Sequence, residues 1–363
     1  LHLDNLGHPA QLDHYLASTA TQVRLIVVRL LGSRGHWSYG LEQLQRWSDE
    51  CADRQLLVLA GTVDQQVDLH GIGTVVPALA DRLAALLREG GETNMARLLD
   101  AIQALLNGTP PDSEDIEVVP LADPFPWDWQ DDPGATVGVV LYRAQLQAGD
   151  TALAQQLNQA LRERGLRPRL IWVSSLRDPA VQAGVLDLLR SQGAQVVITG
   201  TAFASVTTEQ AGLGSALWDS LDRPVLQLLT AGTSRERWQQ SSRGLEPLDL
   251  SLQVVMPELD ARVTTRPCAF RQARPPLGGL ATAITTQQPD RDGINWLVEH
   301  AACWIDLQDT PAKHRRMAMV LANYPVRDGR VANGVGLDTP ASVVNIIGWP
   351  VSYTHLTLPT NTT

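Results

Sequence analysis

Two acidic side chains, Glu258 and Asp260, lie close together in the short segment PELD. The apolar run at residues 252–256 predicts a β-strand before them, so both carboxylates are expected to project to the same face just past a strand end. Such a pair inside a cleft can share or shift protons and can hold a cation. The alternative is that both acids cap the next element or pair with Arg262 and Arg266, because most carboxylates are solvated surface groups.

His70 is the histidine placed best for chemistry, because it opens a His-Gly-Ile-Gly turn in which glycines let the backbone approach a ligand closely. It could act as an axial ligand or a base, and the alternative is an ordinary turn residue. His36 is expected to stack on the neighbouring indole ring. His300 and His314 flank a stretch that contains Trp304, which indicates packing rather than a metal-binding pair.

A glycine-containing turn at residues 333–338, with the sequence NGVGLD, superficially suggests a phosphate-binding loop. It lacks the Lys-Ser/Thr pair of a nucleotide-binding P-loop and follows no clear strand. The sequence therefore predicts no nucleotide binding at this turn.

The composition indicates a folded protein that does not bind nucleic acid. Of 363 residues, 44% are hydrophobic and 19% are charged, with a formal net charge of -10 and no Lys/Arg-rich run. The longest apolar stretches are far shorter than the ~20 residues that cross a bilayer, and the N-terminus lacks a basic-then-apolar signal pattern. We therefore expect a cytoplasmic chain without a membrane span.

The cysteines, Cys51, Cys268 and Cys303, are odd in number and widely separated. This spacing argues against both a disulfide framework and a structural zinc site. We expect buried thiols in a reducing compartment.

The elements that must position these side chains fall into successive units. Residues 1–107 show two β-branched apolar runs separated by a helical pattern, which predicts a βαβ unit with a parallel sheet, followed by two more helices. Residues 108–135, rich in Pro, Asp and Trp, are expected to be a linker. Residues 136–248 alternate apolar strands, including 137–142 and 195–199, with amphipathic helices, including 179–191. This alternation predicts a doubly wound parallel-sheet domain of the Rossmann or flavodoxin type.

Ligands of doubly wound domains lie at the carboxyl ends of the strands. The loops at that edge are therefore the first place to look for a ligand, although turn chemistry alone also selects Gly and Thr. The residues expected there are Tyr142, Arg143, Thr199, Gly200, Thr201, Phe203, Thr230, Ala231 and Gly232.

Five separated blocks together resemble one family. They are VVRLLGSRGHWSYGLEQLQ, LHGIGTVVPAL, VGVVLYRAQLQAGDT, the region from QLLTAGTSRERW to VVMPELDAR, and LANYPVRDGRVANGVGLDTPAS. This pattern is similar to the large subunit of cobaltochelatase, a relative of the porphyrin-binding subunit of magnesium chelatase. The ending GLDTPAS looks more like the cobalt branch than the magnesium branch.

The resemblance implies a multi-domain α/β fold in which residues 249–350 begin the chelatase core. Family members are several times longer, so the chain is expected to be an N-terminal-side fragment that is inactive alone. Residues 351–363, with the sequence VSYTHLTLPTNTT, do not resemble the family and are expected to be a non-native tail.

The resemblance also implies insertion of Co²⁺ into a corrin precursor, hydrogenobyrinic acid a,c-diamide, in cobalamin biosynthesis. Separate AAA+ subunits would hydrolyse ATP, and an adaptor subunit would complete the assembly. The alternatives are Mg²⁺ insertion into protoporphyrin IX by the magnesium branch and a noncatalytic tetrapyrrole-binding scaffold. A periplasmic small-ligand binder would need a signal peptide.

Site roles follow from the resemblance residue by residue. Glu258 is implied in metal delivery or proton acceptance, with Asp260 and His70 as further catalytic candidates. Arginines that pair with the carboxylate and amide arms of a corrinoid are expected in the cavity, and polar residues of the NGVGLD turn are expected to shape its wall. The residues implied are Arg143, Arg262, Arg330, Asn333 and Asp338.

Overall fold

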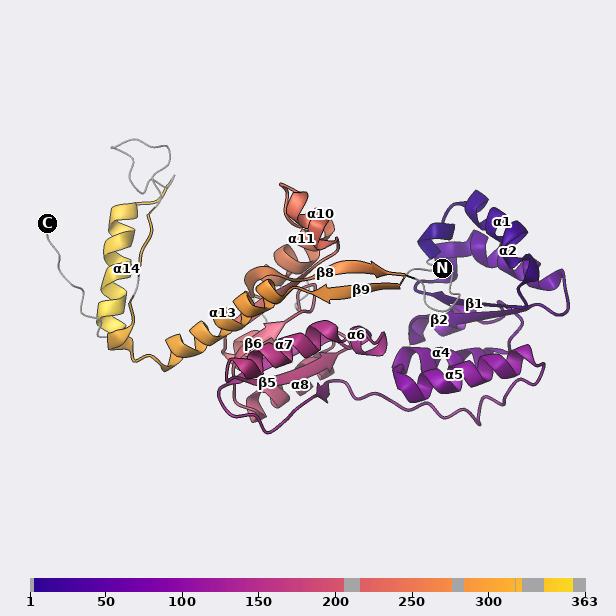
Figure 1. The fold of residues 1–363 in the computed structure, drawn as a ribbon, viewed down its shortest axis with the longest axis horizontal. Helices are drawn as coiled ribbons and strands as arrows, with labels where there is room; N and C mark the ends of the chain where they lie inside the picture. Colours follow the sequence, from indigo (N-terminus) through magenta and orange to yellow (C-terminus); the bar gives the residue numbers. More distant parts are fainter. Residues whose placement is uncertain (1–2, 206–215, 276–283, 317, 322–335, 355–363) are drawn as a thin grey trace.

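The computed structural model describes residues 3–205, 216–275, 284–316, 318–321 and 336–354. Two sheet-containing units follow one another along the chain, and a long helix leads from the second unit to a final helix (Figure 1). These two helices are α13 (Arg291–Asp309) and α14 (Thr339–Thr354). Within these ranges, no helix is long and apolar enough to cross a membrane.

The N-terminal unit is built on a two-stranded parallel sheet. Strands β1 (Leu25–Leu30) and β2 (Gln55–Ala60) are joined by helix α2 (Ser38–Asp49), which confirms the predicted βαβ pattern. Alternate residues of β2 pack against α2 on one face and against α4 and α5 on the other, so this strand is buried almost throughout. The remaining helices are α1 (Pro9–Ser18), α3 (Gln66–Leu69), α4 (Pro77–Glu89) and α5 (Gly91–Leu106).

The second unit is built on a seven-stranded sheet with the order β3-β5-β4-β6-β7-β8-β9. Neighbouring strands from β5 to β8 run parallel, while the edge strands β3 and β9 pair antiparallel. The strands are β3 (Phe125–Trp127), β4 (Thr136–Tyr142), β5 (Arg167–Val173), β6 (Ala194–Thr199), β7 (Val225–Ala231), β8 (Val263–Arg274) and β9 (Ile284–Pro289).

Helices cover both faces of this sheet. Val139 and Leu141 of β4 pack in the cluster with α7 (Ala152–Glu163) and α13, whereas Val140 packs with α8 (Pro179–Ser191) and α9 (Ala216–Leu221). This division follows from strand geometry, since successive side chains point to opposite faces. The arrangement confirms the predicted doubly wound α/β class.

The predicted strand at residues 252–256 is wrong. Those residues lie in a helical stretch made of α11 (Pro247–Leu250), a π-helical turn η5 (Ser251–Val255) and α12 (Met256–Glu258). Pro247 occupies the first helical position, where its missing N–H is not needed, and the apolar run continues this helix. A five-residue stretch with four apolar residues and Gln253 is too short for its periodicity to separate strand from helix.

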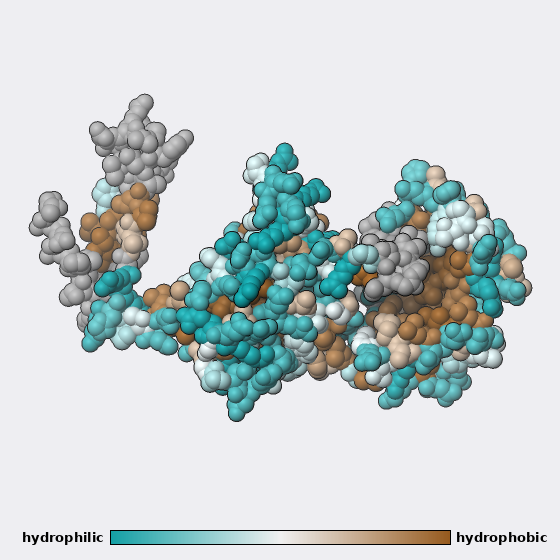
Figure 2. All heavy atoms as spheres, viewed as in Figure 1, coloured by the Kyte–Doolittle hydropathy of each residue, from teal (hydrophilic) through white to brown (hydrophobic). Residues whose placement is uncertain are grey.

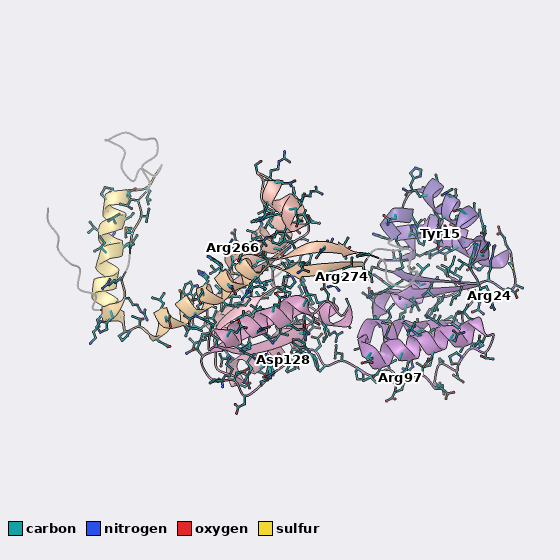
Figure 3. All side chains as sticks on the ribbon, in the orientation of Figure 1. Tyr15, Arg24, Arg97, Asp128, Arg266 and Arg274 are labelled. Carbon is teal, nitrogen blue, oxygen red and sulfur yellow. The ribbon has the colours of Figure 1, made fainter. Side chains whose placement is uncertain are left out.

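A further unit was predicted to start at residue 249. In the sequence, this residue lies between β7 and β8, which are hydrogen-bonded neighbours in one sheet. Strand β8, strand β9 and helix α13 pack with residues 136–248 in the same layers. Arg274, the last residue of β8, lies on the side of the second unit that faces the N-terminal unit (Figure 3). The predicted domain limits remain predictions.

The two units also contact each other through α6 (Arg143–Gln147), which begins directly at the end of β4. The Gln147 side-chain nitrogen donates to the main-chain oxygens of Arg88 (2.6 Å) and Glu89 (2.7 Å), at the end of α4. These carbonyls have no partner within their own helix, so Gln147 satisfies them from the second unit.

On the face shown in Figure 2, apolar side chains reach the surface on the N-terminal unit and on α14. Val67 in α3 is 77% exposed and Val344 in α14 is 69% exposed. Single exposed apolar residues are common, so this feature alone assigns no function.

Candidate functional site

The carboxyl edge of the seven-stranded sheet contains a topological switch point. The chain passes from β4 through α7 to its neighbour β5, and then through α8 across β4 to β6 on the other side. Because α7 and α8 cover opposite faces, the two connections diverge between β4 and β6. Ligands of open α/β sheets bind in the crevice at such a point.

Arg262, directly before the start of β8, lies at the centre of a buried polar network that reaches the loop after β6. Its Nε and Nη2 atoms donate to Asp260 Oδ2 over 3.1 and 2.6 Å, and both side chains are 0% exposed. Its Nη1 atom donates to the main-chain oxygen of Thr201 (2.9 Å) and to Gln227 Oε1 (3.1 Å). The guanidinium also lies over the ring of Trp218, 5.7 Å from the centroid. Its donors are therefore directed at acceptors of the protein itself.

Burial shifts the pKa of two groups in this network. It lowers the pKa of the Arg262 guanidinium, and the adjacent Asp260 carboxylate opposes that effect. Burial raises the pKa of Tyr142, against the opposing effects of Arg262, of Arg177 and of a hydrogen bond to the Ala202 carbonyl. Both directions follow because a low-dielectric surrounding disfavours the charged form.

Asp260 joins the turn after α12 to the loop after β6. Its Oδ2 accepts from the Ser205 amide (2.7 Å) and from the Ser205 hydroxyl (2.9 Å), as well as from Arg262. Its Oδ1 is buried and accepts no hydrogen bond from the described residues. The carboxylate thus fixes the loop between Thr201 and Ser205 against the sheet.

The helical stretch 247–258 is fastened to the end of β7 in the same way. Gln253 accepts from the Thr230 amide (2.8 Å) and donates to the Thr230 carbonyl (2.7 Å), and Asp249 accepts from the Gly232 amide (2.7 Å). The sequence predicted a strand here. The structure has a helical stretch instead, held to the end of β7 by hydrogen bonds made by its polar side chains. The edge loops of β6 and β7 are held by groups close to the PELD segment.

Glu258 and Asp260 do not share a face. Glu258 ends α12 and is exposed, whereas Asp260 is 3% exposed and ion-paired. The expectation of two carboxylates on one strand face is wrong because residues 256–258 are helical, and in a helix side chains two residues apart point in different directions. The alternative pairing of Asp260 with Arg262 is confirmed, and the roles assigned to Glu258 and Asp260 remain predictions.

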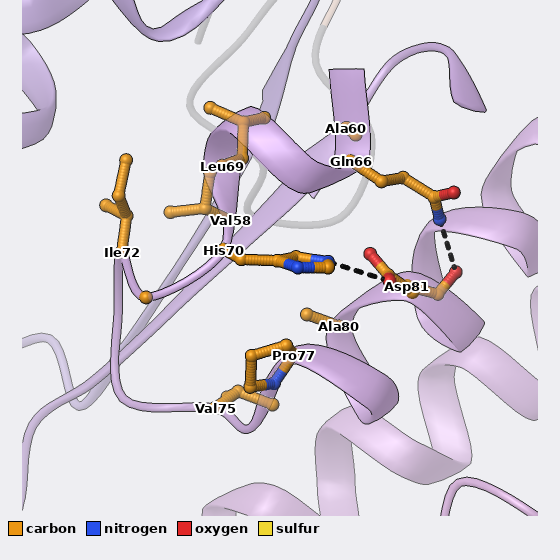
Figure 4. A pocket seen from close by; sticks show the side chains of 11 residues that line it. Val58, Ala60, Gln66, Leu69, His70, Ile72, Val75, Pro77, Ala80 and Asp81 are labelled. Atoms are coloured by element: carbon orange, nitrogen blue, oxygen red, sulfur yellow. Dashed lines mark hydrogen bonds and ion pairs between the residues drawn. The ribbon is translucent and has the colours of Figure 1, made fainter. Parts of the chain in front are cut away.

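His70 lies in the N-terminal unit, where its Nε2 atom is 2.8 Å from Asp81 Oδ2 (Figure 4). The side chains are 36% and 34% exposed. The adjoining cavity has a volume of about 10 Å³, which is room for a single water molecule. Its lining is largely apolar, with Gln66 as a further polar contributor. Ligand or base chemistry at His70 remains a prediction.

The remaining arginine and turn residues have separate surroundings. Arg143 donates to the Leu121 carbonyl (3.0 Å), and Asp338 Oδ1 accepts from the Ala341 amide (3.0 Å) in the first turn of α14. Arg330 and Asn333 lie outside the described residues. Among the described residues, the structure therefore gives Arg143, Arg262 and Asp338 separate partners rather than a shared cavity.

The predictions for the other histidines and for the cysteines are confirmed only in part. His300 stacks on Trp296, with ring centroids 4.9 Å apart, and meets Trp304 edge-on, so packing is confirmed for His300, whereas His314 is exposed. Within the described ranges, no ring contact joins His36 to its neighbouring indole. The expectation of buried thiols holds for Cys268 only.

Cys51 and Cys303 are exposed. Cys51 follows the end of α2, and Cys303 lies on the outer face of α13. Both thiols therefore face solvent rather than the core. The expectation that these two cysteines are buried is wrong.

Sequence reasoning missed Arg177, in the loop between β5 and α8. Its guanidinium carbon lies 5.0 Å from the ring centroid of Phe203, which follows β6. Both loops flank the end of β4, so these side chains lie at the switch point. The position of Arg177 just after a parallel strand was the available signal.

Comparison with known proteins gives a consistent result. The model of the CobN/Magnesium Chelatase family matches residues 84–349. The aerobic cobaltochelatase subunit CobN of a Sinorhizobium species is 34% identical over 95% of this chain and 28% of that protein. The subunit of the same name from Pseudomonas aeruginosa is 31% identical over 95% of this chain and 29% of that protein.

Magnesium-chelatase relatives match less of the chain. The magnesium-chelatase protein of Rhodobacter capsulatus is 24% identical over 59% of this chain and 19% of that protein. The solved catalytic subunit of cobaltochelatase from Mycobacterium tuberculosis has a TM-score of 0.66 at 24% identity and covers 95% of this chain and 28% of its own, which shows the fold. The chain spans less than a third of the length of these relatives.

Proposed function

Because the chain belongs to the CobN/magnesium chelatase family, we propose that it is part of the tetrapyrrole-binding large subunit of a cobaltochelatase. The observation that carries this proposal is the difference in coverage between the two branches. The cobaltochelatase relatives align over 95% of the chain, whereas the magnesium-chelatase protein of Rhodobacter capsulatus aligns over 59%.

The proposed reaction is insertion of Co²⁺, as a substrate, into hydrogenobyrinic acid a,c-diamide. The reaction requires removing water from the metal, removing two pyrrole N–H protons and bending the macrocycle. Carboxylates suit the first two tasks because they bind metal weakly and accept protons. ATP hydrolysis is assigned to AAA+ partner subunits acting with an adaptor, and the assembly to the cytoplasm.

Within this chain, Glu258 is the proposed proton acceptor or metal carrier, because it is exposed beside the carboxyl edge. Asp260 is proposed to position the loop after β6, since its Oδ2 atom already accepts from Ser205 and Arg262. Arg143, Arg330, Asn333 and Asp338 remain proposed substrate contacts, and His70 remains a proposed acid or base.

Binding of tetrapyrroles tests the proposal directly. The chain contains 10 tryptophans, so titration with hydrogenobyrinic acid a,c-diamide should quench their emission at lower concentration than titration with protoporphyrin IX. Preference for the porphyrin would move the assignment to the magnesium branch. Absence of quenching by either compound would reject tetrapyrrole binding by this chain.

A noncatalytic tetrapyrrole-binding scaffold is the second candidate. It is favoured because no three His, Cys, Asp or Glu side chains converge as a metal site in the part of the chain that the structure describes. Cobalt insertion by the full-length protein with its partners should fall in Glu258→Gln and stay normal in Asp309→Asn, an exposed acid at the end of α13. Normal insertion by Glu258→Gln would favour the scaffold.

A further inference from the structure

Phe203 has a strained backbone that the edge network holds in place. Its φ angle is 64°, in the left-handed region, where a bulky side chain is disfavoured. The Phe203 amide donates to the Leu252 carbonyl (2.9 Å), and the preceding Ala202 carbonyl accepts from Tyr142 Oη (2.7 Å). Thr201, one residue earlier, accepts from Arg262. Residues held in such conformations concentrate at functional sites.

The strained conformation presents an aromatic ring at the surface. Phe203 is 39% exposed, whereas its neighbours Thr201 and Ala204 are 1% and 2% exposed. A loop optimised for stability alone would place glycine at this backbone position. The loop therefore carries an aromatic ring at a position where the backbone conformation disfavours one.

Arg177 supplies a positive charge next to this ring. It is exposed, and in the described ranges its guanidinium makes no ion pair or hydrogen bond, only the contact with the Phe203 ring at 5.0 Å. The neighbouring acids are committed to main-chain amides, since Asp123 accepts from Ser174 and Asp178 accepts from Ala180. Unlike Arg262, Arg177 thus has side-chain donors that no described residue occupies.

We propose that Phe203 and Arg177 form a contact site at the switch point for a flat conjugated ring that carries carboxylates. The ring of the ligand would stack on Phe203, and a carboxylate would pair with the planar guanidinium. A tetrapyrrole combines both features, so this inference rests on the proposed function and assigns it two binding residues. A simple anion would need only Arg177.

The test is fluorescence titration of the chain with hydrogenobyrinic acid a,c-diamide and, separately, with protoporphyrin IX. Arg177→Gln and Phe203→Gly should each raise the Kd of the preferred compound about tenfold. Arg223→Gln is the matched control, because Arg223 is exposed beside the amino end of β7, at the opposite edge of the sheet. Its Kd should equal that of the wild type.

Wild-type affinity in Phe203→Gly or in Arg177→Gln would overturn the contact site while leaving tetrapyrrole binding intact. Equal weakening in Arg223→Gln would also overturn it, because the effect would then be one of net charge. If the wild-type chain binds neither compound, both the proposed function and the contact site are rejected.

A comparison of Phe203→Gly with Phe203→Ala separates strain from ring contact. Both variants lack the ring, so both should lose the same affinity. Only glycine adopts the left-handed region without cost, so Phe203→Gly should unfold about 2–4 °C above Phe203→Ala. Equal unfolding temperatures would refute the strain argument, and unequal affinities would refute the role of the ring.

Discussion

Ionisable side chains lie at different depths in the two sheet-containing units. In the second unit, Asp260 and Arg262 form an ion pair in which both side chains are 0% exposed. In the N-terminal unit, His70 and Asp81 also form a close pair, but their side chains are 36% and 34% exposed. The cysteines do not divide in this way, since within the second unit Cys268 in β8 is buried and Cys303 on α13 is exposed.

The contrast shows that depth, more than the presence of a pair, sets what each group contributes. A buried charge loses several kcal/mol of hydration, and only close partners offset that loss. When an exposed ion pair forms, its two groups give up hydrogen bonds to water for hydrogen bonds to each other. Such a pair contributes about 0–1 kcal/mol to the free energy of unfolding. The fixed geometry of the carboxyl edge is a consequence of its burial.

The largest expected effect concerns thiol reactivity. Burial, and then the charge of Asp290, raise the pKa of Cys268 to about 12, so about one thiol in ten thousand is ionised at pH 8. Ellman's reagent should therefore modify Cys51 and Cys303 in the folded chain and reach Cys268 only after unfolding. A Cys51→Ser/Cys303→Ser variant that reacted rapidly in its native state would contradict the burial of Cys268.

Removal of Arg262 should give the next largest effect. Arg262→Met leaves the Asp260 carboxylate buried without its cation, which should lower the free energy of unfolding by about 3–5 kcal/mol in urea titrations. A loss below 1 kcal/mol would mean that this pair behaves like an exposed one.

The double variant Asp260→Ala/Arg262→Met provides the control for that measurement. It removes both charges together, so it should be more stable than Arg262→Met alone. If the double variant were the less stable of the two, packing around the guanidinium, rather than an unpaired charge, would explain the loss.

Asp128 is an intermediate case. It ion-pairs with Arg162 at 2.8 Å and has a 29% exposed side chain (Figure 3). Partial burial would raise the pKa of Asp128, but hydrogen bonds from Arg162, Asn158 and Gln130 outweigh that effect and hold the pKa below its ordinary value. The stabilisation is therefore present at neutral pH and is lost as the pH falls through the lowered pKa.

Asp128→Asn should reduce stability by about 1 kcal/mol at pH 7, and the difference from wild type should shrink below about pH 4. Asparagine also tolerates the φ of 55° at this position, so the substitution tests the charge rather than the backbone. Urea unfolding at several pH values measures it, with Asp131→Asn as the exposed control. A difference that did not depend on pH would exclude the ion pair as its cause.

The smallest effect is expected at His70 and Asp81. A double-mutant cycle with alanine at both positions should give a coupling free energy below about 1 kcal/mol. A larger coupling would show that the pair is shielded from water despite its exposure, and it would weaken the contrast with Asp260 and Arg262.

Local signals predicted much of the fold. The predicted helix at residues 179–191 coincides with α8, because Asp178 caps it and Pro179 occupies the first position. Apolar runs located β4 and β6 to within one residue at either end. Strand β8 was missed, since its polar and proline-containing sequence is set in the sheet by pairing with β7 and β9.

The site was less predictable, because its geometry depends on distant partners. Arg262 is buried by contacts with Thr201 and Gln227, which are 61 and 35 residues away in the sequence. The apolar run before PELD gave no periodic signal for its helical conformation. The sequence therefore predicted two carboxylates on one face, whereas the structure buries Asp260 and exposes Glu258.

Helix α6 connects the switch point to the N-terminal unit. Gln147 binds the last turn of α4, and α6 continues without a spacer from the end of β4. Tyr142 ends that strand, and its hydroxyl holds the loop that carries Phe203. A continuous path of main chain and hydrogen bonds therefore runs from the last turn of α4 to the exposed ring at the carboxyl edge.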